Sequence, residues 1–183
     1  MGDERGFVFK VCVIGDGAVG KTSLITKYTE GEFSGEYIMT LGAQFTRHDM
    51  NIDGTPIELV FWDIAGQESF STLRKGFYKG SRGIIIVFSH EDTKHGKESF
   101  KNFPKWLADV GKNLDTGILP VIIFGNKIDL VDNFDGAKSA AEIEGMMKDY
   151  NFLGYYPTSA LTGEGVNEAF EKLSEKLISI YKH

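Results

Sequence analysis

The sequence predicts an α/β protein built on a mostly parallel sheet, and three observations lead to that prediction. Short runs rich in β-branched and aromatic residues, at 7–15, 57–62, 83–89 and 119–125, alternate with longer stretches of helical spacing. These runs are almost continuously apolar, which is typical of strands buried on both faces. Strands that alternate with helices favour a parallel sheet with helices on both sides.

Two stretches predict individual elements most clearly. Apolar residues recur at every third or fourth position near the end of the chain, at Val166, Phe170, Leu173, Leu177 and Ile180, and predict a helix with one buried stripe. Two strand-like runs flank Asp53-Gly54, a pair typical of tight hairpin turns. One strand at an edge of the sheet should therefore be antiparallel.

Length and composition indicate one soluble domain over residues 1–183. The net charge of −6 comes without a basic stripe, so we expect no nucleic acid as partner. Cys12 is the single cysteine, which excludes a disulfide framework and favours a reducing compartment.

The two ends of the sequence carry no targeting pattern. No apolar run approaches the ~18 residues of a membrane-spanning helix, and the charged start lacks a signal-peptide core. The last residues contain no cysteine that could be prenylated. We therefore expect a cytoplasmic protein, with peripheral membrane contact only through a lipidated tail outside this sequence.

A phosphate-binding loop follows the first strand. The segment GDGAVGKTS matches the pattern G-x-x-x-x-G-K-[ST] between a predicted strand and a predicted helix. Its residues are the candidate phosphate ligands: Gly15, Asp16, Gly17, Ala18, Val19, Gly20, Lys21, Thr22 and Ser23. Glycines let backbone N–H groups point at an anion, Lys21 supplies a point charge, and the Thr22 hydroxyl suits Mg²⁺. A glycine-rich turn that merely caps a helix is the alternative.

A candidate base-recognition motif, Asn126-Lys127-Ile128-Asp129, follows the last apolar run, where open parallel sheets bind ligands. The Asp129 carboxylate can accept both hydrogens that guanine offers on one edge, and adenine has no such pair. The stem of Lys127 can lie on the base. In isolation, a helix N-cap made by Asp129 is the alternative.

A second short segment should complete the base site. Within Thr158-Ser159-Ala160-Leu161, a backbone N–H could be donated to the guanine O6 atom. We therefore count Ser159, Ala160 and Leu161 among the candidate nucleotide-binding residues.

Together these motifs resemble those of the Ras-superfamily small GTPases, over nearly the whole chain. GEFSGEYIMTLGAQF (31–45) and WDIAGQESF (62–70) most resemble the Rab branch, and TLG also resembles Ran. The resemblance implies a P-loop NTPase fold: a six-stranded, mostly parallel sheet with one antiparallel edge strand and five helices. It also implies GTP and GDP as ligands and Mg²⁺ as cofactor.

The resemblance assigns further roles around the nucleotide. Phe33 would lie against the guanine edge and Tyr37 over the phosphates. Thr40 would reach Mg²⁺ with its hydroxyl and the γ-phosphate with its N–H. Gly66 would offer an N–H to the γ-phosphate, and Gln67 would orient the attacking water.

Two sets of residues follow from these roles. The catalytic residues would be Gln67, Lys21 and Thr40. The metal ligands would be Thr22, Thr40 and, through a water, Asp63, which ends a strand predicted to lie near the phosphate loop.

The expected function is a GTP/GDP switch with slow intrinsic hydrolysis, because the matched motifs assign no arginine to the phosphates. Exchange factors, GTPase-activating proteins and effectors would bind through residues 31–48 and 62–80, and Rab-like residues suggest membrane trafficking. Ser69 stands where Rab-like relatives usually have arginine. Two alternatives stay open: a nucleotide-locked Ran-like or scaffold module with little catalysis, and an ATP-dependent kinase.

Overall fold

The computed structural model describes residues 6–29, 39–40, 42–66, 71–114, 118–148 and 150–182. The strands are β1 (Phe7–Ile14), β2 (Met39–Thr40), β3 (Ala43–Ile52), β4 (Thr55–Ile64), β5 (Gly83–Ser89), β6 (Val121–Asn126) and β7 (Phe152–Pro157). The helices are α1 (Lys21–Thr29), α2 (Ser71–Tyr78), α3 (Lys94–Gly111), the short 3₁₀ helix η2 (Ile128–Leu130), α4 (Gly136–Met146) and α5 (Val166–Tyr181).

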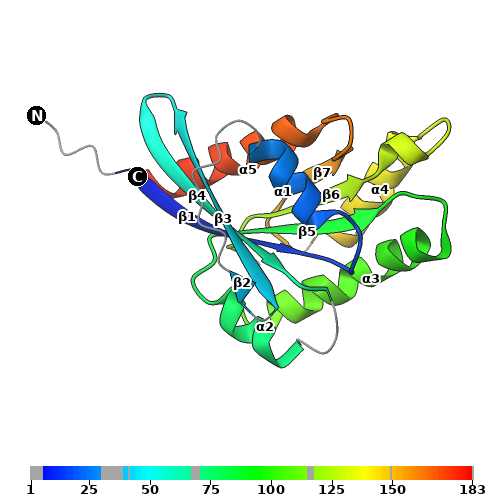
Figure 1. Ribbon diagram of the computed structural model, residues 1–183, viewed down its shortest axis with the longest axis horizontal. Coiled ribbons are helices and arrows are strands. Elements are labelled where there is room, and N and C mark those ends of the chain that lie inside the picture. The colour runs from blue at the N-terminus through cyan, green and yellow to red at the C-terminus, as the bar shows by residue number, and fades with distance from the viewer. Residues whose placement is uncertain are drawn as a thin grey trace, which may run out of the picture.

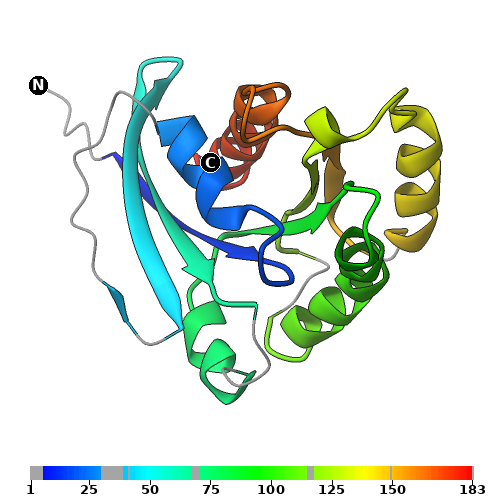
Figure 2. The same ribbon diagram turned by 45° about the vertical axis from the view of Figure 1, so that its right-hand side comes forward.

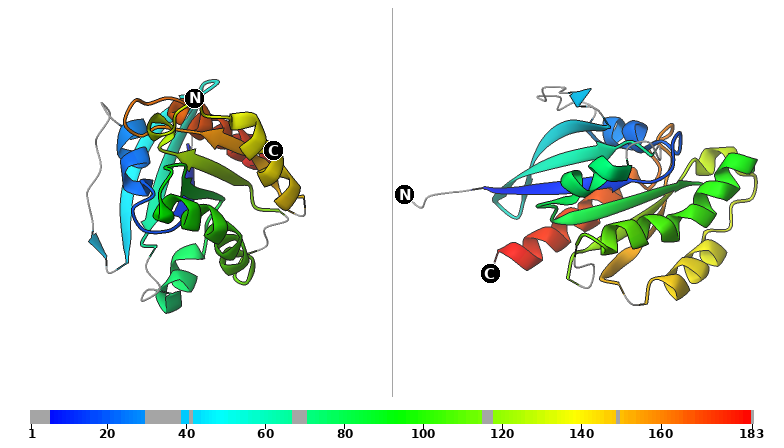
Figure 3. Two further views of the ribbon diagram at one scale, coloured as in Figure 1. Left: turned by 90° about the vertical axis from the view of Figure 1, so that its right-hand side faces the viewer. Right: turned by 90° about the horizontal axis from the view of Figure 1, so that it is seen from below.

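The strands form one mixed sheet in the order β2-β3-β4-β1-β5-β6-β7, with β1 running through its middle (Figures 1 and 3). Neighbours from β4 to β7 pair in parallel, and β3 pairs antiparallel with β4. The predicted six strands and five α-helices are confirmed. The two-residue β2 was not predicted, and it lies outside β3 at the antiparallel edge.

The predicted hairpin joins β3 to β4. Asp53 and Gly54 both adopt positive φ angles, of 49° and 78°, between the paired residues Ile52 and Thr55. A two-residue turn of this kind matches the right-handed twist of the flanking strands. The Gly54 N–H donates to Asn51 Oδ1 at 2.8 Å, which closes the turn.

Helices cover both faces of the sheet, and Figure 2 shows α1 and α5 on one side and α2 and α3 on the other. Successive residues of β1 alternate between the two layers: Val11 and Val13 pack with α1 and α5, and Cys12 and Ile14 with α2, α3 and α4. All residues of β5 are buried, as expected for a strand covered on both faces.

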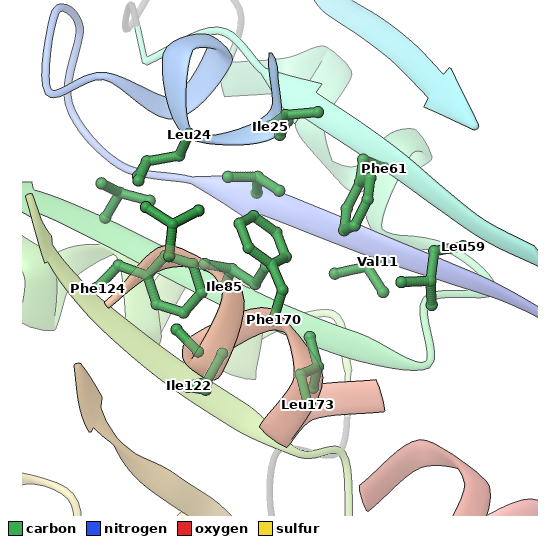
Figure 4. Packing of buried hydrophobic residues seen from close by; sticks show 14 of the residues in the cluster. Val11, Leu24, Ile25, Leu59, Phe61, Ile85, Ile122, Phe124, Phe170 and Leu173 are labelled. Carbon is green, nitrogen blue, oxygen red and sulfur yellow. The ribbon is translucent and has the colours of Figure 1, made fainter. Parts of the chain in front are cut away.

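Phe170 of α5 lies at the centre of one core layer (Figure 4). Its ring meets Phe61 of β4 and Phe124 of β6 edge to face, at centroid distances of 5.2 and 5.1 Å, and stacks on Tyr28 of α1 at 4.3 Å. The predicted stripe of α5 is confirmed apart from its last member, because Ile178 rather than Ile180 is buried there.

The sheet brings distant residues to one edge. Asp63 of β4 lies beside Val13 at the end of β1, and Asn126 of β6 lies beside Ser89 at the end of β5. The segments that follow β1, β4 and β6 therefore meet beyond the carboxyl ends of the parallel strands. Within the described residues, no helix combines the length and apolar character needed to cross a membrane.

Candidate nucleotide-binding site

The loop between β1 and α1 has a backbone that requires glycine at two positions. Gly15 and Gly20 have φ angles of 141° and 99°, which side chains disfavour. A Cβ on Gly15 would lie 2.1 Å from the Val87 carbonyl oxygen, and one on Gly20 would lie 2.2 Å from Asn126 Nδ2. The glycines therefore allow this loop to pack closely against β5 and β6.

Lys21 begins α1 and its side chain folds back into the loop. Its Nζ donates to the carbonyl oxygens of Gly15 at 3.0 Å and Asp16 at 2.8 Å, and the residue is only 7% exposed. Burial lowers the pKa of Lys21, while the charges of Asp63 and Asp16 oppose that shift. An ammonium has three donors, so one remains for a phosphate oxygen.

The next residue, Thr22, meets Asp63 across the sheet edge: its hydroxyl donates to Asp63 Oδ2. Asp63 is 9% exposed, and burial raises the pKa of its carboxyl, against the effects of the Thr22 hydrogen bond and the Lys21 charge. A hydroxyl and a carboxylate together form a hard-oxygen donor set that fits Mg²⁺. The described residues hold no cluster of three metal-ligating His, Cys, Asp or Glu, and Mg²⁺ bound beside phosphates needs none.

Gly66 and Gly17 face each other with very different surroundings. A Cβ on Gly66 would lie 2.5 Å from both the Gly15 oxygen and the Gly17 nitrogen, so this glycine touches the phosphate loop directly. A Cβ on Gly17 would meet no described atom within 4 Å. The backbone at residue 66 therefore needs glycine, whereas residue 17 has room beside it.

Asn126 links the two halves of the site. It is 1% exposed; its Nδ2 donates to the Val19 carbonyl at 2.9 Å, and its Oδ1 accepts from the Ala160 N–H at 3.0 Å and the Thr158 hydroxyl at 3.4 Å. The Val19 side chain lies in the core, so only its backbone faces this site. One buried amide thus fixes the phosphate loop against the segment after β7.

Lys127 and Asp129 follow Asn126 in the chain and are more exposed than it is. Lys127 has a φ angle of 66°, and its Nζ lies 3.2 Å from Glu91 Oε2 in a mostly buried ion pair. Asp129 is exposed, and its Oδ1 accepts a hydrogen bond from the Ser159 hydroxyl at 2.5 Å. The second carboxylate oxygen can accept further donors.

The segment after β7 was expected to offer a backbone N–H to guanine, but its N–H groups already have acceptors within the protein. The backbone N–H groups of Thr158, Ser159 and Ala160 donate to Gly125 O, Glu164 O and Asn126 Oδ1. All three are therefore used within the protein, and a guanine O6 would have to share or replace one of these acceptors. Leu161 is 77% exposed at the end of the segment.

Phe33, Tyr37 and Gln67 lie outside the described residues, and so does Ser69. Thr40 ends β2, where its backbone pairs with Ala43.

The remaining members of the phosphate loop lie at its surface. Ala18 adopts a φ angle of 57°, and it is exposed together with Gly17, Thr22 and Ser23.

Sequence reasoning missed two residues of α3 that hold the phosphate loop. Trp106 Nε1 and Asn102 Nδ2 each donate to one carboxylate oxygen of Asp16, both at 2.8 Å. Their spacing of four residues places them on one face of the helix, but this spacing does not predict that both bind Asp16.

The comparisons with known proteins identify the family of this chain. The model of the Ras family matches residues 10–179. The chain belongs to the Ras family. It is 33% identical over 181 residues to "GTP-binding protein YPT1" of Saccharomyces cerevisiae, covering 97% of this chain and 82% of that protein.

Two further relatives carry Rab names. "Ras-related protein Rab-1" of Theileria annulata is 36% identical over 179 residues, covering 95% of this chain and 76% of the relative. "Ras-related protein Rab-13" of Bos taurus is 34% identical over 178 residues, covering 97% and 84%. This member of the Ras family is therefore a small GTPase of the Rab branch, as the motifs predicted.

An aromatic cluster lies on the sheet surface beside α2. The Trp62 ring meets Phe45 at a centroid distance of 4.2 Å and Phe77 at 5.9 Å, and Lys10 Nζ lies 3.4 Å above its ring. These aromatic residues fall within the segments 31–48 and 62–80. Trp62 is only partly buried, so part of this aromatic surface is open to a partner.

Proposed function

We propose that residues 1–183 form one G domain that works as a switch operated by GTP and GDP, with slow intrinsic hydrolysis. In this proposal Gly15–Ser23 hold the phosphates and Asn126–Asp129 read the guanine base. Gly66 would sense the γ-phosphate through its backbone N–H, and Gln67 would orient the water that attacks it. Loss of that phosphate removes contacts made in only one state, which is how such loops change shape.

The observation that carries the proposal is the pair of bonds made by Asn126. Phosphate loops occur in many nucleotide enzymes, but here a buried amide joins that loop at Val19 to the segment bearing Ser159 and Ala160. Asp129 and Ser159 are in turn hydrogen-bonded to each other. These bonds connect the residues proposed to bind phosphate with those proposed to bind the base, which supports one shared nucleotide site.

For the metal, Thr22 and Asp63 are the residues proposed to hold Mg²⁺, Asp63 through a water, with Thr40 as a further ligand. When bound there, Mg²⁺ would offset phosphate charge. Lys21 would bind a phosphate oxygen with its remaining donor, and the low exposure of Lys21 and Asp63 keeps water from screening these charges.

We further propose that the GTP form recruits effectors through residues 31–48 and 62–80, in a Rab-like role in membrane trafficking. The surface formed by Phe45, Trp62 and Phe77 supports this, because clustered aromatic side chains are enriched at protein interfaces. Exchange factors and GTPase-activating proteins would use the same segments.

The experiment combines nucleotide extraction from purified protein with single-turnover hydrolysis of GTP and ATP. Bound GDP, slow GTP turnover and an increase in rate of about 10³–10⁵-fold with a suitable activating protein would support the switch. Tight GTP binding without turnover would instead favour the nucleotide-locked module. A preference for ATP would contradict both.

A further inference from the structure

A negatively charged side chain lies in the loop proposed to bind phosphate, and its environment explains how the loop tolerates it. Asp16 directly precedes Gly17, and its carbonyl oxygen accepts from Lys21 Nζ at 2.8 Å. A carboxylate that turned toward the phosphates would repel them, because close like charges destabilise each other. In the structure, the Asp16 carboxylate points toward α3 instead.

Both carboxylate oxygens of Asp16 are satisfied by α3. The indole N–H of Trp106 donates to Oδ1 and the amide of Asn102 donates to Oδ2, each at 2.8 Å. Trp106 is 7% exposed, so its hydrogen bond is largely shielded from water. Hydrogen bonds to a charged group contribute more than neutral ones, and leaving such a group unsatisfied is costly.

The same tryptophan also contacts α2. The guanidinium carbon of Arg74 lies 4.9 Å from the centroid of the Trp106 ring, and Arg74 Nε lies 3.0 Å from Asp109 Oδ2. That carboxylate oxygen also accepts from the Tyr78 hydroxyl at 2.8 Å. Two polar contacts and one cation–π contact thus join α2 to α3 next to the point where α3 holds the phosphate loop.

We propose that Trp106 is a positioning residue for nucleotide binding, acting through Asp16, and that it links the phosphate loop to α2 through Arg74. This inference rests on the proposed function. The Trp106 N–H keeps the Asp16 carboxylate away from the phosphates and fixes the loop backbone that Lys21 also binds. The ring, rather than the N–H, makes the contact with Arg74, so the two roles can be separated by substitution.

The test is a double-mutant cycle on the rate of GDP release, measured with a fluorescent GDP. Trp106→Phe keeps an aromatic ring but removes the N–H, and we expect release about tenfold faster. On the Asp16→Ala background, Trp106→Phe should change the rate less than about twofold, because no carboxylate is left to hold. Equal effects in both backgrounds, or an unchanged rate in the single variant, would overturn the proposal.

Phe103→Leu is the matched control, since it loosens the buried face of the same helix and carries no donor for Asp16. We expect Phe103→Leu to lower stability without the dependence on Asp16. If it reproduced that dependence, general packing of α3 would explain the result and the proposal would be wrong.

A second measurement does not depend on nucleotide. The sequence has two tryptophans, so NMR shows two indole N–H signals, and Trp106→Phe identifies one of them. Asp16→Ala should shift the Trp106 signal and leave that of Trp62 in place. No shift would overturn the inference, whereas a protein that shows the shift but binds no guanine nucleotide would contradict the proposed function instead.

Discussion

The two ends of the proposed nucleotide site are built from different interactions. At the phosphate end, the charged groups Lys21 and Asp63 are almost fully buried, and burial shifts both pKa values toward the neutral forms. At the base end, the buried group is the neutral amide of Asn126, and the charged Asp129 is exposed.

This difference indicates that the two ends contribute differently to nucleotide binding. Buried charges are strongly destabilised without a counter-charge, so the phosphate end gains most from a charged ligand and should supply affinity. Directed hydrogen bonds reject a ring whose donors and acceptors do not match, so the base end should supply specificity. Asn126 makes the two ends depend on each other.

The largest expected effect is at Lys21. Lys21→Met should weaken GDP binding by about 10²–10³-fold, since it removes the buried positive charge proposed to bind a phosphate oxygen. Calorimetric titration with GDP and Mg²⁺ measures this. Lys172→Met, at an exposed position of α5, is the matched control and should stay within about twofold of the unmodified protein. If Lys21→Met weakened GDP binding by less than about tenfold, the proposal that the phosphate end supplies most of the affinity would be wrong.

At the base end, Asp129→Asn should change specificity. The amide offers a donor where the carboxylate only accepts, so GDP binding should weaken by about 10²-fold while xanthosine diphosphate binds better than GDP. Competition between the two nucleotides gives the ratio directly. Asp132→Asn, an exposed neighbour, should leave the preference for guanine unchanged. If Asp129→Asn weakened both nucleotides equally, this end would contribute affinity alone.

A smaller effect is expected at Gly17, where added atoms meet no described neighbour within 4 Å. Gly17→Val should therefore fold and bind GTP, yet slow single-turnover hydrolysis by about tenfold by crowding the γ-phosphate and Gln67. Gly145→Ala, at a helix position that is equally open, serves as the control and should hydrolyse GTP normally. Unchanged turnover in Gly17→Val would argue against this placement of the γ-phosphate.

The smallest effect on binding concerns His90, which packs beside the base end: a Cβ on Gly125 would lie 2.4 Å from its Nε2. Burial lowers the pKa of His90 from 6.5 to about 4. The unfolded chain therefore takes up a proton before the folded one, so this contribution to stability is complete above pH 6.5 and declines as pH falls toward 4.

The loss over that pH range should be about 1–2 kcal/mol for a partly exposed group. His90→Gln should flatten the corresponding slope in urea unfolding and leave GDP affinity unchanged. An unaltered slope would mean that groups other than His90 govern the stability in acid. Weaker GDP binding would mean that His90 also contributes to binding at the base end.

Local patterns predicted most of the fold and the candidate site. The hairpin at Asp53-Gly54 and the stripe of α5 depend on near neighbours in sequence, and so does the glycine pattern of Gly15 and Gly20. The last position of the stripe was wrong, because helical spacing allows both Ile178 and Ile180 and only the packing of α5 against the sheet selects Ile178.

Contacts between distant segments could not be predicted in this way. Asn126 binds a residue 107 positions away, and Trp106 binds one 90 positions away. The residues near Asn126 in the sequence do not indicate that it binds Val19. They also do not indicate that the Ala160 N–H donates to the Asn126 side chain. Such pairs depend on strand order and register, which long-range packing sets.

By itself, the sequence determined the chemistry available: a loop that can bind phosphate, a carboxylate that can read guanine, and a strand pattern that brings both to one edge. Tertiary structure alone decided which groups are buried and which are joined. It buried Lys21 beside Asp63, used Asn126 to connect the two ends, and turned Asp16 toward Trp106. The physical reason is that burial and hydrogen-bond geometry depend on all packed layers together, whereas backbone propensity depends on a few adjacent residues.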